Sequence, residues 1–290
     1  MNVQQEIFVI AGMPKAATTF LYFTLGKHPD IYAPARKEID YFSDVHYRKG
    51  YNWYINLFKE KKAPQIGMDC TPVYFMDNSA IKRMKEFNPD IKVILIIRNP
   101  VDWVISFYKH MGDISVQRPD IKSFVTQGLH YKKEGIEQHV VFNNGFVKKR
   151  IQEYVKEFGS NLLLLNFSLI EQTPLEAIIE IEKFIGISNY FNENNVENIK
   201  LNSSDKKSIP ILSYLKRNKL FVSSVTKIFP PRLIFRVNEK LHRLLLNKSA
   251  PSEPSTNYEI PFIKEQMKED TEYFYTLFND SKIVIPKPTH

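Results

Sequence analysis

The segment GMPKAATTF, residues 12–20, carries one lysine and two adjacent threonines. It follows a short β-branched run, so the sequence predicts that it is the loop between a first strand and a helix. Free backbone N–H groups and the helix dipole make such a loop a binding site for an anion such as phosphate. In this interpretation Lys15 reaches a bridging oxygen beyond a 5′-phosphate, while Thr18 and Thr19 donate hydrogen bonds to the phosphate. A capped helix with an exposed lysine would also explain these nine residues.

The spacing within this loop differs from that of ordinary NTPase loops. A Walker loop requires G-x-x-x-x-G-K-[ST], but Ala17 occupies the place of the second glycine, and the lysine precedes the hydroxyl pair by three residues. The pattern suits a phosphate-containing donor that needs no metal. The histidines show no metal-ligand spacing and Cys70 is the only cysteine, so we expect no metal site.

A second set of anion-binding side chains lies in RNPVDWVISFY, residues 98–108. Arg98 ends an almost wholly apolar run, and Ser106 lies two turns into the helix that Asn99 and Pro100 are expected to begin. Both side chains can face one phosphate, because arginine offers planar bidentate donors and serine offers one more. Taken singly, a helix-cap salt bridge and a serine that fills a helix groove explain them equally well.

Together the two motifs resemble the 5′-phosphosulfate loop and the 3′-phosphate motif of the sulfotransferases that use 3′-phosphoadenosine 5′-phosphosulfate (PAPS). Residues 25–58 and IGMDCTPVYF, residues 66–75, are similar to the branch that sulfates glycans, including heparan sulfate, and later segments resemble bacterial members more loosely. The resemblance implies transfer of the sulfuryl group to a hydroxyl of a carbohydrate, glycolipid or small molecule, with release of adenosine 3′,5′-bisphosphate. The nucleotide-binding residues that it implies are Pro14, Lys15, Ala16, Ala17, Thr18, Thr19, Arg98 and Ser106.

The resemblance also implies a catalytic role for Glu38, in the charged segment RKEID. We expect Glu38 to accept the proton of the acceptor hydroxyl and Lys15 to stabilise charge on the leaving oxygen. Lys37, Asp69 and Tyr41 are candidate acceptor contacts. Without the resemblance, a surface carboxylate explains Glu38, a turn-forming acid explains Asp69 and a core aromatic explains Tyr41 equally well or better.

The sequence departs from the family pattern in three places. Ala16 and Ala17 replace the Gly-rich part of the loop, which predicts a slightly altered loop conformation. Asp40 stands where glycan members often have histidine, so this chain lacks the histidine that would have an auxiliary role there. The late Lys-Gly phosphate-binding loop of the heparan enzymes is not recognisable. The candidates to replace it are Asn202, Ser203, Lys207 and Lys248.

The elements that must position these residues alternate between strands and helices. Strands are expected at residues 6–11, 91–97 and 161–166, and helices at 18–27, 146–158, 174–185 and 260–278. Such alternation predicts an α/β fold, with a P-loop-like, doubly wound parallel sheet flanked by helices. We see no domain boundary, so residues 1–290 are expected to form one sulfotransferase domain.

Composition and charge limit the partners and the location. A chain of 290 residues with 43% hydrophobic residues can bury a sizeable core. Residues 206–248 carry eleven Lys and Arg against one acid, so this segment can attract a polyanion or an acidic membrane surface, although a solvated helical face explains it as well. The single cysteine fits a reducing cytoplasm. Through the basic segment 206–248, we expect peripheral contact with the inner membrane surface.

Two other classes of function remain open. A small-molecule kinase would use the same strand, loop and helix, although the position of the lysine argues against it. A non-catalytic glycan- or membrane-binding module would use the basic segment and tolerate loss of Glu38. Binding of nucleic acid is not expected, because the positive charge lies away from any recognisable helix-turn-helix or single-strand platform.

Overall fold

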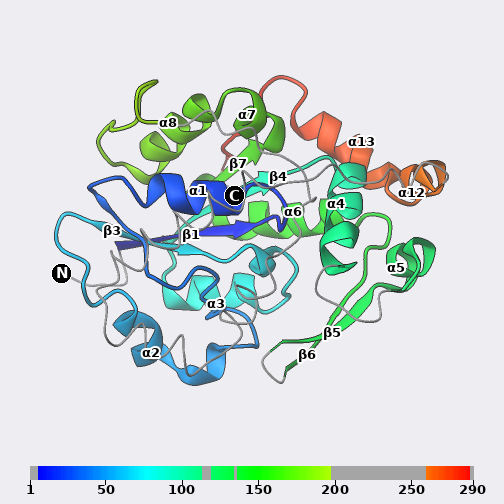
Figure 1. Ribbon diagram of the computed structural model, residues 1–290, viewed down its shortest axis with the longest axis horizontal. Helices are drawn as coiled ribbons and strands as arrows, with labels where there is room; N and C mark the ends of the chain where they lie inside the picture. The colour runs from blue at the N-terminus through cyan, green and yellow to red at the C-terminus, as the bar shows by residue number, and fades with distance from the viewer. Residues whose placement is uncertain (1–5, 113–118, 134–135, 197–258, 288–290) are drawn as a thin grey trace.

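The computed structural model describes residues 6–112, 119–133, 136–196 and 259–287 of the chain. Its centre is a six-stranded sheet of order β2–β3–β1–β4–β7–β8 (Figure 1). The first five strands are parallel to their neighbours, and β8 is antiparallel to β7. The strands are β1 (Ile7–Gly12), β2 (Ile31–Tyr32), β3 (Ile66–Cys70), β4 (Lys92–Ile97), β7 (Leu162–Asn166) and β8 (Ile283–Val284).

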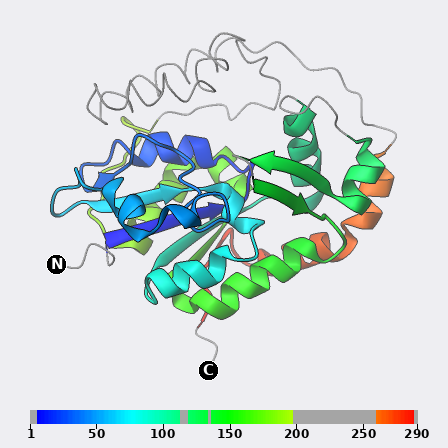
Figure 2. The same ribbon diagram turned by 90° about the horizontal axis from the view of Figure 1, so that it is seen from below.

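Helices cover both faces of this sheet, as expected for a doubly wound fold. Figure 2 shows α3 and α6 side by side along one face and α1 along the other. The helices are α1 (Thr18–Leu25), α2 (Tyr51–Asn56), α3 (Ala80–Phe87), α4 (Pro100–Gly112), α5 (Ile121–Gln127), α6 (Phe146–Phe158), α7 (Phe167–Gln172), α8 (Pro174–Ile185), α12 (Ile260–Gln266) and α13 (Lys268–Leu277). The predicted α/β class and its mostly parallel sheet are confirmed.

The predicted start of α4 is also confirmed. The Asn99 side-chain oxygen accepts hydrogen bonds from the N–H groups of Val101 at 3.0 Å and Asp102 at 3.4 Å, and Pro100 is the first helical residue. This cap satisfies two donors that the first turn of a helix leaves without intrahelical partners.

The single helix predicted at 260–278 is wrong in its continuity, because α12 and α13 are separated at Met267. Contacts with the start of α6 explain the break. The Glu269 N–H donates to the Asn144 side chain, while the Asp270 carboxylate accepts from the N–H groups of Gly145 and Lys148. These bonds cap two helix starts at once and therefore favour a new helix after Met267.

The sequence did not indicate a hairpin formed by β5 (Leu129–Lys133) and β6 (Ile136–Val140), which lies beside α5 at the margin of the molecule (Figure 1). Among the described residues, no helix has the length and apolar character needed to cross a membrane. The basic segment 206–248 and the candidates Asn202, Ser203, Lys207 and Lys248 lie outside the described residues.

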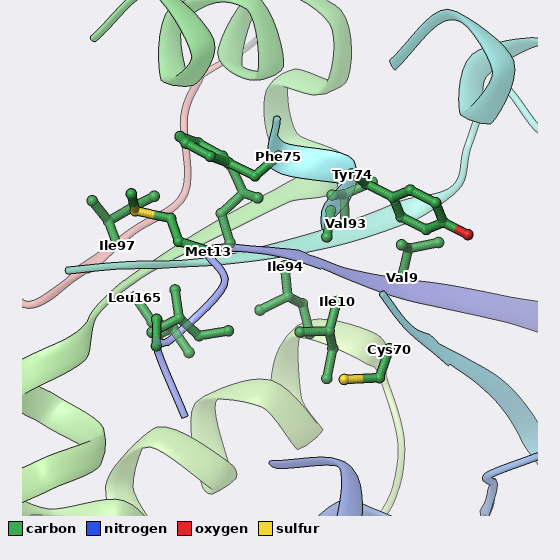
Figure 3. Packing of buried hydrophobic residues seen from close by; sticks show 14 of the residues in the cluster. Val9, Ile10, Met13, Cys70, Tyr74, Phe75, Val93, Ile94, Ile97 and Leu165 are labelled. Carbon is green, nitrogen blue, oxygen red and sulfur yellow. The ribbon is translucent and has the colours of Figure 1, made fainter. Parts of the chain in front are cut away.

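The strands that carry the candidate site are buried on both faces. Figure 3 shows Val93 and Tyr74 on one side of the strands and Ile10 and Cys70 on the other. Since successive strand residues face opposite sides, Asp69 faces the Tyr74 side and its neighbour Cys70 faces α1. The two residues at the end of β3 therefore serve different faces of the sheet.

Candidate functional site

The loop that follows β1 is fixed by hydrogen bonds to β4 and α4. The Met13 N–H donates to the Ile96 carbonyl at 2.9 Å, and Met13 itself is fully buried. The Pro14 carbonyl accepts from the Trp103 indole N–H at 2.9 Å, and the Lys15 carbonyl accepts from the Arg98 guanidinium at 3.0 Å. Because two consecutive carbonyls are held by side chains, the backbone of the predicted phosphate loop has a defined orientation.

The conformation of this loop suits an anion. Lys15 and Ala17 have φ values of 63° and 59°, in the left-handed region. Backbones that alternate in this way form concave nests of N–H groups, and the first turn of α1 adds N–H groups that have no intrahelical acceptor. Thr18 is buried and Thr19 half-buried at this helix start, where both were predicted.

The alanine at position 17 makes this loop conformation costly. A left-handed conformation costs a residue with a Cβ roughly 1–2 kcal/mol, which glycine would avoid. Ala17 is also the N-cap of α1 and makes no side-chain capping bond. Ala17 therefore adopts a left-handed conformation with strain that a glycine at this position would not have.

Arg98 joins the two predicted phosphate motifs. Besides its bond to the Lys15 carbonyl, its guanidinium lies over the Phe167 ring, 4.6 Å from the ring centroid. Burial lowers the pKa of Arg98, and the charges of Asp102 and Glu171 oppose this effect, so the side chain stays cationic. A guanidinium has five N–H donors, and its bond to Lys15 uses one of them.

Ser106 lies on α4 with 8% of its surface exposed. Its position two turns into the helix agrees with the sequence. Its participation with Arg98 in a single phosphate site stays a prediction.

Glu38 lies on a loop above the end of β3. Its N–H donates to the Cys70 carbonyl at 3.2 Å, and the Cys70 thiol contacts the Thr18 carbonyl at 3.4 Å. Cys70 thereby connects the Glu38 loop to the start of α1, which follows the phosphate loop. The phosphate loop, Arg98 and the Glu38 loop, which come from distant segments, thus lie at the same edge of the sheet, where the parallel strands β1, β3 and β4 end.

Lys37 forms an ion pair with Glu38, with 2.9 Å between Nζ and Oε1. Burial acts to lower the pKa of Lys37, but attraction to Glu38, Cys70 and Asp40 outweighs it, and the net pKa is raised. The Lys37 side chain is 17% exposed and that of Glu38 is 42% exposed. The pair therefore presents a charged ammonium and an accessible carboxylate together.

The other two candidate acceptor contacts are turned into the protein. Asp69 is fully buried, and its carboxylate accepts from the hydroxyls of Thr71 at 2.6 Å, Tyr74 at 3.0 Å and Tyr54 at 3.2 Å. Burial raises the pKa of Asp69 to about 7, although the three hydroxyl donors act to lower it. Tyr41 is also buried and stacks on Tyr54, with 4.2 Å between ring centroids. Acceptor contacts by Asp69 and Tyr41 stay predictions.

Sequence reasoning missed the residues that hold the site. Trp103 lies within the second motif, but nothing in the pattern indicates its bond to Pro14. Thr71 and Tyr74 lie within IGMDCTPVYF, where the sequence indicates no role for them. Among the residues that the structure describes, no three His, Cys, Asp or Glu side chains are grouped so that they can hold a metal ion, and the expected absence of a metal remains a prediction.

The sequence of this chain matches a known protein family. The sulfotransferase domain profile matches residues 5–245. The chain belongs to the sulfotransferase domain family. The family resemblance inferred from the two motifs is therefore confirmed.

Curated sulfotransferases show the same relationship. The mouse heparan sulfate glucosamine 3-O-sulfotransferase 3B1 is 27% identical over 195 residues, which cover 64% of this chain and 49% of that protein. The human bifunctional heparan sulfate N-deacetylase/N-sulfotransferase 1 is 27% identical over 193 residues, which cover 62% of this chain and 22% of that protein. The chain thus spans about half the length, or less, of these relatives.

A solved structure shares the fold. The crystal structure of a sulfotransferase from Alicyclobacillus acidocaldarius superposes with a TM-score of 0.54 at 21% identity, covering 76% of this chain and 93% of that one. The likeness to bacterial members expected from the sequence is thus found at the level of the fold.

Proposed function

We propose that this sulfotransferase domain transfers the sulfuryl group of PAPS to a hydroxyl of a carbohydrate or glycolipid, releasing adenosine 3′,5′-bisphosphate. The observation that carries the proposal is the hydrogen bond from Arg98 to the Lys15 carbonyl. This bond brings together two motifs that lie 83 residues apart in the chain. A donor with a 5′-phosphosulfate and a 3′-phosphate requires two such groups of ligands.

The residues of the two motifs divide between the two phosphates. The loop formed by Pro14, Lys15, Ala16, Ala17, Thr18 and Thr19 would hold the 5′-phosphosulfate. Its left-handed residues and the first turn of α1 fit an anion. Arg98 and Ser106 would hold the 3′-phosphate, for which a guanidinium supplies paired donors.

The chemistry that we propose needs in-line geometry and charge stabilisation. Glu38 accepts the proton of the acceptor hydroxyl as the new S–O bond forms, and Lys15 stabilises the negative charge on the oxygen that leaves with the nucleotide. Lys37 holds the Glu38 carboxylate at 2.9 Å and adds positive charge beside the transferring group. No metal is required for these steps.

For the acceptor, we propose a polysaccharide or glycolipid. The names of the relatives refer to heparan sulfate, and the sequence of 206–248 is strongly basic, as expected for contact with an anionic glycan or membrane surface. We further propose that residues 1–290 form one domain, which the family match over 5–245 supports. The buried thiol of Cys70, the chain's only cysteine, suits a reducing cytoplasm.

Calorimetry with adenosine 3′,5′-bisphosphate, without divalent metal, tests the donor before any acceptor is known. We expect Arg98→Ala to lose about 1.5–3 kcal/mol of binding free energy, the contribution of hydrogen bonds to charged groups. Glu38→Gln should bind the nucleotide as tightly as the wild type. Arg83→Ala is the matched control, because Arg83 pairs with Asp44 and lies over Tyr47 instead of the phosphate loop.

The alternatives predict other results. Binding of ATP·Mg²⁺ in place of the bisphosphate would favour a kinase, and binding of neither nucleotide would favour a non-catalytic module. If the bisphosphate binds, transfer of labelled sulfate from PAPS to desulfated heparan sulfate tests the acceptor class. Glu38→Gln should then slow transfer by about 10²–10⁴-fold, the usual contribution of a general base.

A further inference from the structure

The loop that carries Glu38 has an unfavourable backbone conformation. Glu38 and Asp40 have φ values of 62° and 59°, in the left-handed region that residues with a side chain rarely adopt. Such a conformation persists only where the surrounding structure over-determines it. The contacts that hold this loop are therefore part of what places the Glu38 carboxylate.

Hydrogen bonds hold alternate backbone N–H groups of the loop. The Glu38 N–H donates to the Cys70 carbonyl at 3.2 Å. The Asp40 N–H donates to the Thr71 hydroxyl at 3.4 Å, and the Phe42 N–H donates to the Tyr74 hydroxyl at 3.2 Å. Two of the three acceptors are thus side-chain hydroxyls, whose positions depend on what they bind in turn.

Both hydroxyls bind the same carboxylate. Thr71 donates to Oδ1 of Asp69 at 2.6 Å and Tyr74 donates to Oδ2 at 3.0 Å. All three side chains are fully buried, so water does not compete for these bonds. Tyr54 also donates to Oδ2, at 3.2 Å, but its hydroxyl has no bond to the loop backbone among the hydrogen bonds of the described residues.

We infer that Asp69 is a positioning residue for Glu38. Through its hydrogen bonds with Thr71 and Tyr74, Asp69 orients the two hydroxyls that hold the strained loop. It thereby directs the Glu38 carboxylate toward the substrate hydroxyl that accepts the sulfuryl group. This inference rests on the proposed role of Glu38 as the base. In this role Asp69 supports the Glu38 loop from its buried side, instead of binding the acceptor substrate directly. The raised pKa of the Asp69 carboxyl fits a group that is enclosed by the protein.

Two matched variants separate positioning from general stability. Tyr74→Phe and Tyr54→Phe each remove one hydroxyl from a fully buried tyrosine that binds the same oxygen of Asp69. Only the Tyr74 hydroxyl also accepts a loop N–H. The inference therefore predicts different effects on the Glu38 loop from two substitutions of the same chemistry.

Amide hydrogen exchange of the full chain, resolved by residue, measures the difference without an acceptor. The informative group is the Glu38 N–H, because neither variant touches its own acceptor, the Cys70 carbonyl. We expect its exchange to be about ten-fold faster in Tyr74→Phe, the equivalent of losing one buried hydrogen bond, and unchanged in Tyr54→Phe. Equal exchange at Glu38 in the two variants would overturn the inference. If Tyr74→Phe also speeds exchange throughout β4, Thr71→Val provides the same comparison with a smaller change in shape.

Kinetics provide a second readout. With PAPS and desulfated heparan sulfate as the probe acceptor, Tyr74→Phe should lower kcat by about ten-fold or more and leave the Kd for adenosine 3′,5′-bisphosphate unchanged. Asp69→Ala should lower kcat further, and Asp69→Asn, which keeps an acceptor oxygen for Thr71, should restore part of it. A fall in nucleotide affinity equal to the fall in kcat would contradict positioning. If the wild type transfers nothing to this probe, the proposed acceptor class fails, while hydrogen exchange still decides the inference.

Discussion

Ala17 is in a left-handed conformation that glycine would adopt without strain, and its neighbour Ala16 is not. Ala16 is fully buried and Ala17 partly buried, both in the phosphate loop. The same substitution to glycine at the two adjacent positions should therefore have different effects on stability. The comparison tests whether the loop has the geometry on which nucleotide binding is proposed to depend.

The expected magnitudes follow from three effects. Glycine at position 17 relieves about 1–2 kcal/mol of backbone strain, from which about 0.5–1 kcal/mol is lost to its greater freedom in the unfolded chain. Loss of the half-buried methyl group lowers the free energy of unfolding by about 0.4 kcal/mol more. The net change in the free energy of unfolding for Ala17→Gly is therefore near zero. Ala16→Gly has no strain to relieve and loses a fully buried methyl, which gives a loss of about 1.5 kcal/mol. The two variants should differ by about 2 kcal/mol.

Urea denaturation of the full chain at 25 °C and pH 7, without nucleotide, measures both free energies of unfolding. In thermal melts the same difference corresponds to roughly 4 °C for a chain of this size. If Ala17→Gly loses as much stability as Ala16→Gly, the left-handed conformation of Ala17 is refuted, and with it the nest of N–H groups in the loop.

Replacing Trp103 with Phe removes the indole N–H that binds the Pro14 carbonyl, and we expect affinity for adenosine 3′,5′-bisphosphate to fall about three- to ten-fold, the effect of one hydrogen bond. Calorimetry checks this, and unchanged affinity would show that the loop does not depend on that bond. Burial raises the pKa of Asp69 to about 7, so between about pH 4 and pH 7 the folded chain keeps a proton that the unfolded chain has lost. This group should therefore lower the free energy of unfolding as pH rises through that window, by up to about 4 kcal/mol, and Asp69→Asn should abolish that part of the decline. Urea titrations of both proteins at pH 4.5 and 8 measure it, and parallel pH dependence would contradict the shift. Asp270→Ala removes two acceptor bonds at the start of α6 and should lower the free energy of unfolding by about 1–2 kcal/mol, the usual effect of losing a cap. A melting temperature equal to that of the wild type would show that this cap adds nothing.

The sequence was sufficient for much of the fold. The strands that became β1, β4 and β7 were predicted within one or two residues, because unbroken apolar runs are typical of buried parallel strands. The strand β3, the hairpin of β5 and β6 and the two-residue strands β2 and β8 were missed, since short or polar strands form by pairing with neighbours instead of by a strong local pattern. The break at Met267 was missed for a related reason. It depends on capping bonds from a distant segment.

By itself, the sequence determined the two anion-binding motifs, their places after predicted strands and the family of the chain. Those features are local, because they depend on residue types at fixed spacing. Only the tertiary structure decided that Arg98 binds the Lys15 carbonyl, that Trp103 binds the Pro14 carbonyl and that Asp69 lies beneath the Glu38 loop. Each of these contacts joins segments brought together by the strand order, and a spacing pattern contains no information about that order or about which backbone carbonyl faces which side chain.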